Sequence, residues 1–118
     1  MKNLAISIFA VILLSSCSKN TVKDVTVSVT ENGQYQGNPS FAINAEYTPE
    51  TFGENIEEFA VEITVTATSN SQPTVTKIIT LRNNDFKACR GEMVHGLGYH
   101  FNSEMTGAYQ ISHTKRML

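Results

Sequence analysis

From residue 25 onward, apolar and polar side chains alternate along the chain with a period of two. Val25, Val27 and Val29 are separated by hydroxyl side chains, and the same alternation recurs over residues 41–47 and 59–68. Successive side chains of a β-strand point to opposite faces, so this period is typical of strands with one buried face. The pattern therefore predicts a strand in each of these three segments.

Turn-forming residues separate these runs and divide the rest of the chain into short segments. Glycine tolerates positive φ and proline restricts φ, so turn chemistry is supplied by Asn32-Gly33, by Gln36-Gly37-Asn38-Pro39 and by Thr48-Pro49. Residues 74–81 predict a further strand, in which Ile78 and Ile79 must point to opposite faces. Shorter runs predict strands over residues 86–88, 99–102 and 109–112. Loops are predicted at residues 31–38, 48–58, 69–73 and 83–98.

The number and spacing of these strands indicate the fold class. The chain has 118 residues, which is enough for one domain. Six or seven short strands without intervening helices predict an all-β fold, because a parallel sheet needs strands that alternate with helices. We predict a small antiparallel β-sandwich, immunoglobulin-like or transthyretin-like. The absence of tryptophan excludes the cysteine–tryptophan–cysteine core of antibody domains.

The first residues have the pattern of an export signal. Lys2 precedes an apolar run over residues 4–14, which is too short to span a membrane as a permanent helix. Leu14-Ser15-Ser16-Cys17 follows and resembles the lipobox of bacterial lipoproteins. The expected organisation is a signal peptide at residues 1–16, a lipidated tether at residues 17–23 and one β-sandwich domain at residues 24–118.

The lipobox resemblance implies an anchor and a location. By that resemblance, Cys17 carries diacylglycerol through a thioether and becomes the N-terminus after cleavage. Two or more acyl chains make membrane attachment stable. Ser18, rather than aspartate, follows the cysteine, which favours the bacterial outer membrane with the domain facing the periplasm. Exposure on the cell surface is the alternative.

Charge excludes one class of partner and points to another. The net charge is −2 and the isoelectric point is near 5.9, so nucleic acid is not an expected partner. Four acids, Glu50, Glu54, Glu57 and Glu58, fall in one predicted loop. An acidic loop of this kind can steer a basic protein partner, or it can simply keep the sheet edges soluble.

Residues with reactive or metal-binding side chains gather in the last third of the chain. Cys89, His95 and His100 are competent ligands, but their spacing fits no zinc pattern, and on one strand the two histidines would face opposite sides. We expect Cys89 to be a buried thiol, with a reactive thiol or an intermolecular disulfide as alternatives. The sequence has no hydrolase elbow, phosphate loop or metalloprotease motif. We therefore expect a non-enzymatic protein without a metal or other cofactor.

The leading functional hypothesis combines the anchor with the absence of catalytic motifs. It is a lipid-anchored, non-catalytic binding or accessory subunit of the cell envelope, which meets a protein partner through loops or a sheet edge. A second hypothesis is a glycan- or peptidoglycan-binding lipoprotein, in which Tyr35, between turn residues, is the exposed stacking aromatic. A third is a metal-binding or thiol-dependent protein that uses Cys89, His95 and His100.

Overall fold

The computed structural model of the protein describes residues 21–49 and 56–118. In this part the chain forms seven strands and one short 3-10 helix, and every strand pair is antiparallel. No helix within these residues is long and apolar enough to cross a membrane. In chain order the elements are β1 (Thr26–Tyr35), β2 (Asn38–Tyr47), β3 (Ala60–Thr68), β4 (Val75–Arg82), η1 (Asn83–Asp85), β5 (Lys87–Cys89), β6 (Glu92–His100) and β7 (Gln110–Met117).

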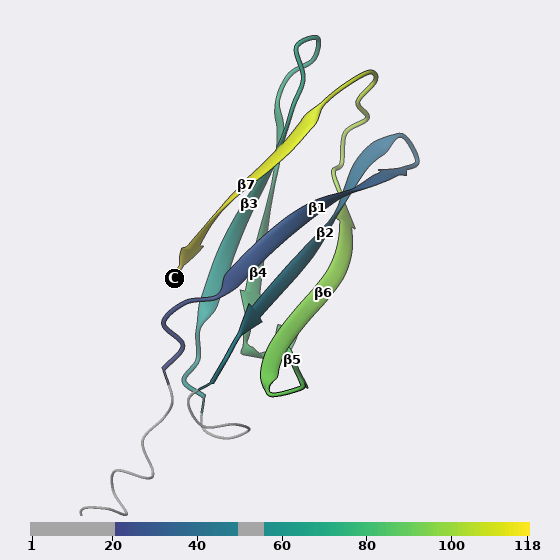
Figure 1. Cartoon of the computed structure of the whole chain (residues 1–118). Helices are drawn as coiled ribbons and strands as arrows, with labels where there is room; N and C mark the ends of the chain where they lie inside the picture. Colours follow the sequence, from purple (N-terminus) through teal and green to yellow (C-terminus); the bar gives the residue numbers. More distant parts are fainter. Residues whose placement is uncertain (1–20, 50–55) are drawn as a thin grey trace, which may run out of the picture.

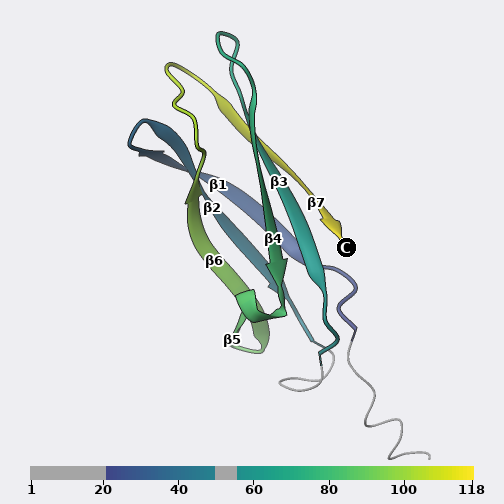
Figure 2. The same ribbon diagram turned by 180° about the vertical axis from the view of Figure 1, so that it is seen from behind.

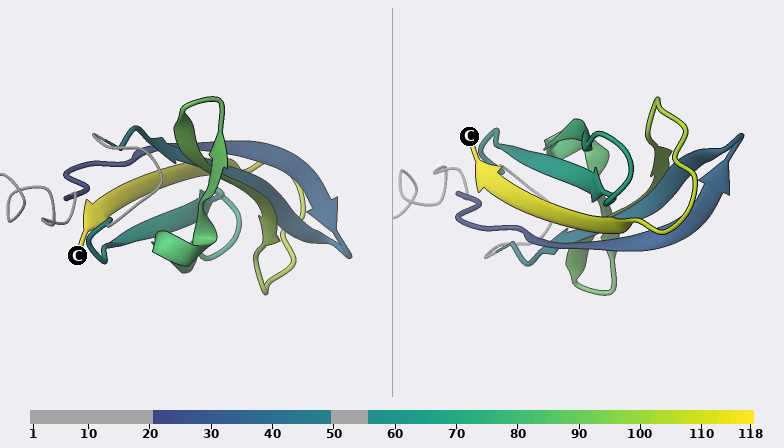
Figure 3. Two further views of the ribbon diagram at one scale, coloured as in Figure 1. Left: turned by 90° about the horizontal axis from the view of Figure 1, so that it is seen from below. Right: turned by 90° about the horizontal axis from the view of Figure 1, so that it is seen from above.

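The strands form two sheets that pack face to face (Figure 1). One sheet has the order β1-β2-β6-β5 and the other has the order β4-β3-β7. Figure 2 shows the second sheet in front, and Figure 3 shows both layers along the strands. The predicted small antiparallel β-sandwich is confirmed. The two sheet orders correspond to strands A, B, E, D and C′, C, F of the immunoglobulin arrangement, one of the two types predicted.

The core lies between β2 and β3, the central strands of the two sheets. Their inward positions alternate with polar outward positions, as the period of two predicts. Burying a valine, isoleucine or phenylalanine side chain contributes about 1.5–3 kcal/mol, so these two strands supply much of the stability. The inward side chains, all at most 1% exposed, are Phe41, Ile43, Ala45, Val61, Ile63, Val65 and Ala67.

Aromatic rings close both ends of this core. At the end near the N-terminal tether, the ring of Tyr47 lies 5.1 Å, centroid to centroid, from the rings of Phe59 and Phe86. At the opposite end, Phe41 and Phe101 are also 5.1 Å apart. Tilted and edge-on ring pairs at this separation are favourable beyond the area they bury.

The predicted loop over residues 31–38 is wrong, because β1 and β2 form a tight hairpin there. The chain reverses at Gln36 and Gly37, which have φ values of 53° and 83°. A two-residue turn with positive φ matches the twist of the paired strands. Asn32-Gly33 lies instead in a β-bulge, where the pairing register shifts and Gly33 has a φ of 71°.

The predicted loop over residues 83–98 is also wrong. The nine-residue strand β6 occupies its second half and pairs with β2 along its whole length. Met93, His95 and Leu97 do alternate in this segment, but glycines separate the last of them from its neighbours. Glycine is depleted in strands, and this signal masked the period of two.

Strand β7 continues through the basic end of the chain, beyond the predicted strand at residues 109–112. Lys115 Nζ donates to Asp24 Oδ1 at 2.9 Å and to the carbonyl oxygen of Val25. The hydrogen bond from Lys115 is the largest cause that lowers the pKa of Asp24. This contact joins the start of β1 to the end of β7 and closes one side of the sandwich.

The register of the three-stranded sheet predicts a contrast between two isoleucines. Ile63→Ala should lower the free energy of unfolding by about 2–5 kcal/mol, because the side chain is fully buried on a central strand. Ile78→Ala on β4, where the side chain is 60% exposed, should change it by less than about 1 kcal/mol. Urea unfolding followed by circular dichroism measures both. Equal losses would contradict the assigned faces of β3 and β4.

Candidate functional site

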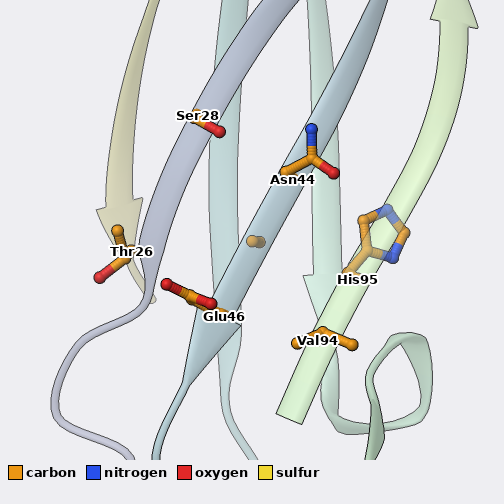
Figure 4. A pocket seen from close by; sticks show the side chains of 7 residues that line it. Thr26, Ser28, Asn44, Glu46, Val94 and His95 are labelled. Carbon is orange, nitrogen blue, oxygen red and sulfur yellow. The ribbon is translucent and has the colours of Figure 1, made fainter. Parts of the chain in front are cut away.

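The outer face of the four-stranded sheet is hollowed in two places. The first hollow, of about 220 Å³, crosses β1, β2 and β6 toward the tether end of the sheet (Figure 4). The second, of about 320 Å³, lies at the opposite end of the same strands. The residues that line the first are Thr26, Ser28, Asn44, Ala45, Glu46, Val94 and His95.

Two glycines keep the outer face of β6 free of side chains. Gly96 pairs with Asn44, and a Cβ atom at Gly96 would lie 3.2 Å from Asn44 Oδ1. That distance is tight, so the Asn44 side chain occupies space that only glycine leaves open. Gly98 follows on the same face, so no side chain rises from β6 between Val94 and His100.

Two carboxylates lie together at the tether end of this face. Glu46 on β2 and Glu92 on β6 are close enough to share a hydrogen bond, which raises the pKa of Glu46. Repulsion between the two negative charges raises the pKa of Glu46 further. The pair therefore holds a proton more readily than two separate glutamates would.

The second hollow is built around an aromatic pair. The ring of Tyr35, 53% exposed, lies 5.0 Å from the ring of His100, centroid to centroid, with an interplanar angle of 31°. Tyr35 ends β1 and His100 ends β6. Ser40 lies between these ends on β2 and is only 8% exposed, so it forms the floor of the hollow.

His95 faces the interior and is held by two hydrogen bonds. Its Nδ1 donates to the carbonyl oxygen of Asp85 at 2.8 Å, and its Nε2 lies 3.0 Å from the hydroxyl of Tyr99. With Nδ1 protonated in the neutral ring, Nε2 accepts from that hydroxyl. Burial, and then the charge of Asp85, raise the pKa of Tyr99. The hydrogen bond to Asp85 joins β6 to η1, so His95 has a structural role in the core.

The structure does not bring Cys89, His95 and His100 together. Cys89 pairs with Glu92 and shares its face, whereas His95, three residues further along β6, points to the other side. His100 lies at the far end of β6. Within residues 21–49 and 56–118, no three histidine, cysteine or acidic side chains are grouped as metal ligands would be.

The expected burial of Cys89 is wrong, because its thiol is free and exposed. The residue ends β5, a three-residue strand at the edge of the four-stranded sheet. All three residues of β5 are exposed. Ala88 and Cys89 are small and apolar, which suggested a buried segment. They belong instead to an edge strand whose side chains are exposed.

The predicted acidic loop is described only in part. Glu57 and Glu58 are exposed near the tether, and Glu57 Oε2 accepts a hydrogen bond of 2.9 Å from Thr21 Oγ1. Glu50 and Glu54 lie outside the described residues, as do the predicted signal peptide at residues 1–16 and the predicted lipid attachment site Cys17.

Sequence reasoning missed two exposed aliphatic side chains, one on the outer face of β4 and one on the inner face of β6. Ile78 is 60% exposed and Leu97 is 58% exposed. Lys77 Nζ of β4 donates to the carbonyl oxygen of His100 of β6 at 2.8 Å, which places these two strands beside each other across the sandwich. We call the unpaired edge of β4, together with the outward-facing Ile78, the β4 flank.

No protein-family model, curated protein or solved structure matches this chain. The fold is therefore established by its own strand order, and the function is argued from its own surfaces.

The exposure of Cys89 predicts labelling in the native state. In a Cys17→Ala chain, Cys89 is the remaining cysteine, and it should react with a maleimide at a rate close to that of the urea-unfolded chain. Mass spectrometry of timed samples measures both rates. Protection of the native thiol by more than about tenfold would contradict the placement of β5, and Cys89→Ser in the same background is the blank.

The Glu46 and Glu92 pair predicts a pH dependence of stability. The raised pKa of folded Glu46 stabilises the fold below the ordinary glutamate pKa of 4.5, and this contribution is lost as pH rises through the folded value. Glu92→Gln should lower the pKa of Glu46 and flatten the fall in Tm between about pH 4 and pH 7. NMR titration and thermal scans measure the two effects. Glu58→Gln, which removes an exposed carboxylate elsewhere, should leave the pKa of Glu46 unchanged.

Proposed function

We propose that the protein is a lipid-anchored, non-catalytic accessory subunit of the bacterial cell envelope that binds a protein partner through the β4 flank. The lipobox resemblance of Leu14-Ser15-Ser16-Cys17 supports the anchor. Residues 21–24 lead into β1 at one end of the sandwich (Figure 1). The separation of Cys89 from His95 and His100 supports a binding role rather than catalysis.

The observation that carries the protein-binding role is the unpaired edge of β4. All eight residues of β4 pair with β3 on one side, and no described strand pairs with the other side. An exposed edge offers backbone donors and acceptors to an added strand. Ile78 lies on β4 beside this edge and provides apolar surface that the added strand would cover.

The opposite edge of the same sheet is less suited to an added strand. In the immunoglobulin arrangement the outer edge of β7 is the place of a further strand, and no described strand fills it. His113 and Lys115 share a face with the buried Val65 and Ile63 of β3, yet both are exposed. Inward-pointing charged residues are a common device that blocks edge pairing.

Charge indicates the kind of segment that the β4 flank accepts. Strand β4 carries Lys77 and the exposed Arg82 and no carboxylate. A partner segment with alternating apolar residues and at least one acid would match both the aliphatic side chains and the basic ones. The partner is therefore an envelope protein that contributes an extended, acidic strand.

This proposal predicts the effect of one substitution on partner capture. The lipidated protein, solubilised from native membranes with mild crosslinking, should retain a stoichiometric envelope protein. Ile78→Lys should reduce the yield of that protein at least tenfold, because it places a charge in the covered apolar surface. Quantitative mass spectrometry measures the yield. Cys17→Ala should release the protein from membranes and lower the capture as well.

The matched control lies at the same register on the other edge. Thr64 pairs with Ile78 on β4 and with Thr114 on β7, so Thr114→Lys adds the same charge to the same face of the sheet. It should leave capture unchanged. Equal effects of the two variants, or a partner that survives Ile78→Lys, would remove the β4 flank from the proposal.

A further inference from the structure

A second surface, separate from the β4 flank, has the chemistry of a ligand site. It is the hollow of about 320 Å³ at the end of the sandwich opposite the tether, which we call the distal hollow. It is shallow and open to solvent, so it suits one face of a single sugar ring rather than an enclosed ligand. The residues used below are Asn32, Gln34, Tyr35, Ser40, Gly98 and His100.

The aromatic pair supplies a platform for an apolar ring face. Tyr35 keeps 53% of its surface exposed, and His100 packs against it at 5.0 Å. The contact limits the motion of the Tyr35 ring, so little further entropy is lost when a ligand stacks on it. A pyranose ring presents a face of C–H groups, and such a face stacks on an aromatic ring.

The polar groups around this platform are uncharged and of mixed type. The amide of Asn32 carries a donor and an acceptor, and the hydroxyl of Ser40 carries both. His100 Nδ1 donates to the carbonyl oxygen of Phe101 at 3.0 Å, which leaves Nε2 of the neutral ring as an acceptor. Alternating donors and acceptors without a carboxylate or cation match the hydroxyl groups of a neutral ligand better than a phosphate or a metal ion.

Local structure holds the hollow open. The β-bulge at Asn32-Gly33 displaces the end of β1, and Gly98 leaves the outer face of β6 bare beside Ser40. Gln34 Nε2 donates to the carbonyl oxygen of Met105 at 3.4 Å, which ties one wall to the loop that follows β6. The site is therefore formed before any ligand arrives.

From these observations we propose that the distal hollow binds a neutral saccharide, with one pyranose ring stacked on Tyr35 and its hydroxyl or acetamido groups bonded to Asn32, Ser40 and His100. The hollow lies at the end of the sandwich opposite residue 21, so with the anchor of the proposed function, on which this step rests, it would face away from the membrane. It is then directed toward the polysaccharide of the envelope. N-acetylated sugars, as in peptidoglycan, and unmodified hexoses both have the ring face and the neutral polar groups that this site would bind.

The test is a titration of the full lipidated protein in micelles of a zwitterionic detergent, since sugar detergents would compete. The probes are the trimer of N-acetylglucosamine and maltotriose. NMR chemical-shift changes and calorimetry measure the binding of each probe. At least one should bind with a Kd of about 1 mM or tighter, as expected for a single stacked ring. Preference for the first probe indicates peptidoglycan-type sugars, and preference for the second indicates hexose polymers.

Substitutions separate the stacking role from folding. Tyr35→Ala should weaken binding at least tenfold, whereas Tyr35→Phe should retain it within about threefold, because the ring remains. Leu97→Ala removes an exposed apolar side chain outside the distal hollow and should leave Kd unchanged. Absence of binding to both sugars at about 10 mM, or equal affinity of Tyr35→Ala and the unaltered protein, would overturn the proposal.

Discussion

The structure depends on the contact between β2 and β3 across the middle of the sandwich. Each is the central strand of its sheet, and their inward side chains exclude water almost completely. Every other strand is attached to one of these two, either directly or, for β5, through β6. Because the hydrophobic contribution is concentrated there, the outer faces and edges need not pack against anything. The outer surfaces can therefore consist of polar residues, glycines and unpaired strand edges, and the proposed binding surfaces are of this kind.

The same concentration explains which elements the sequence predicts. The strands at residues 41–47 and 59–68 alternate clearly because one face is fully buried and the other is wet. β6 was missed because glycines occupy its outer positions, where Asn44 needs the space at Gly96. A loop was predicted over residues 31–38 because two turn signals fall in it; strand pairing makes Gln36-Gly37 the turn and Asn32-Gly33 the bulge. In β6 and in the β1–β2 hairpin, pairing between strands outweighs the local preferences of the residues.

The surfaces were less predictable than the fold, since they are assembled by pairing between distant segments. Tyr35 was predicted to be exposed from its turn-forming neighbours, and it is. Tyr35 lies beside Ser40 and His100 because Ser40 of β2 pairs with His100 of β6. This pairing joins distant segments, so it cannot be predicted from the residues around Tyr35 alone. Leu97 reads as a core residue, because it alternates with the inward His95. It is exposed because β5 ends before it and leaves the upper part of β6 as an open edge.

The two ends of the sandwich differ in how their loops are held, and this difference bears on function. At the distal end, Gln72 and Thr106 exchange two hydrogen bonds of 2.6 and 3.1 Å between loops from different sheets. The amide of Phe101 also donates to the carbonyl oxygen of Pro39 at 2.9 Å. These bonds join the β3–β4 loop, the β6–β7 segment and the start of β2 at this end of the sandwich, beside the distal hollow. In the proposed arrangement, with the lipid at the other end, this distal end would be suited to capture of a fixed polymer. The β4 flank lies at the side of the sandwich, so the two proposed sites do not overlap.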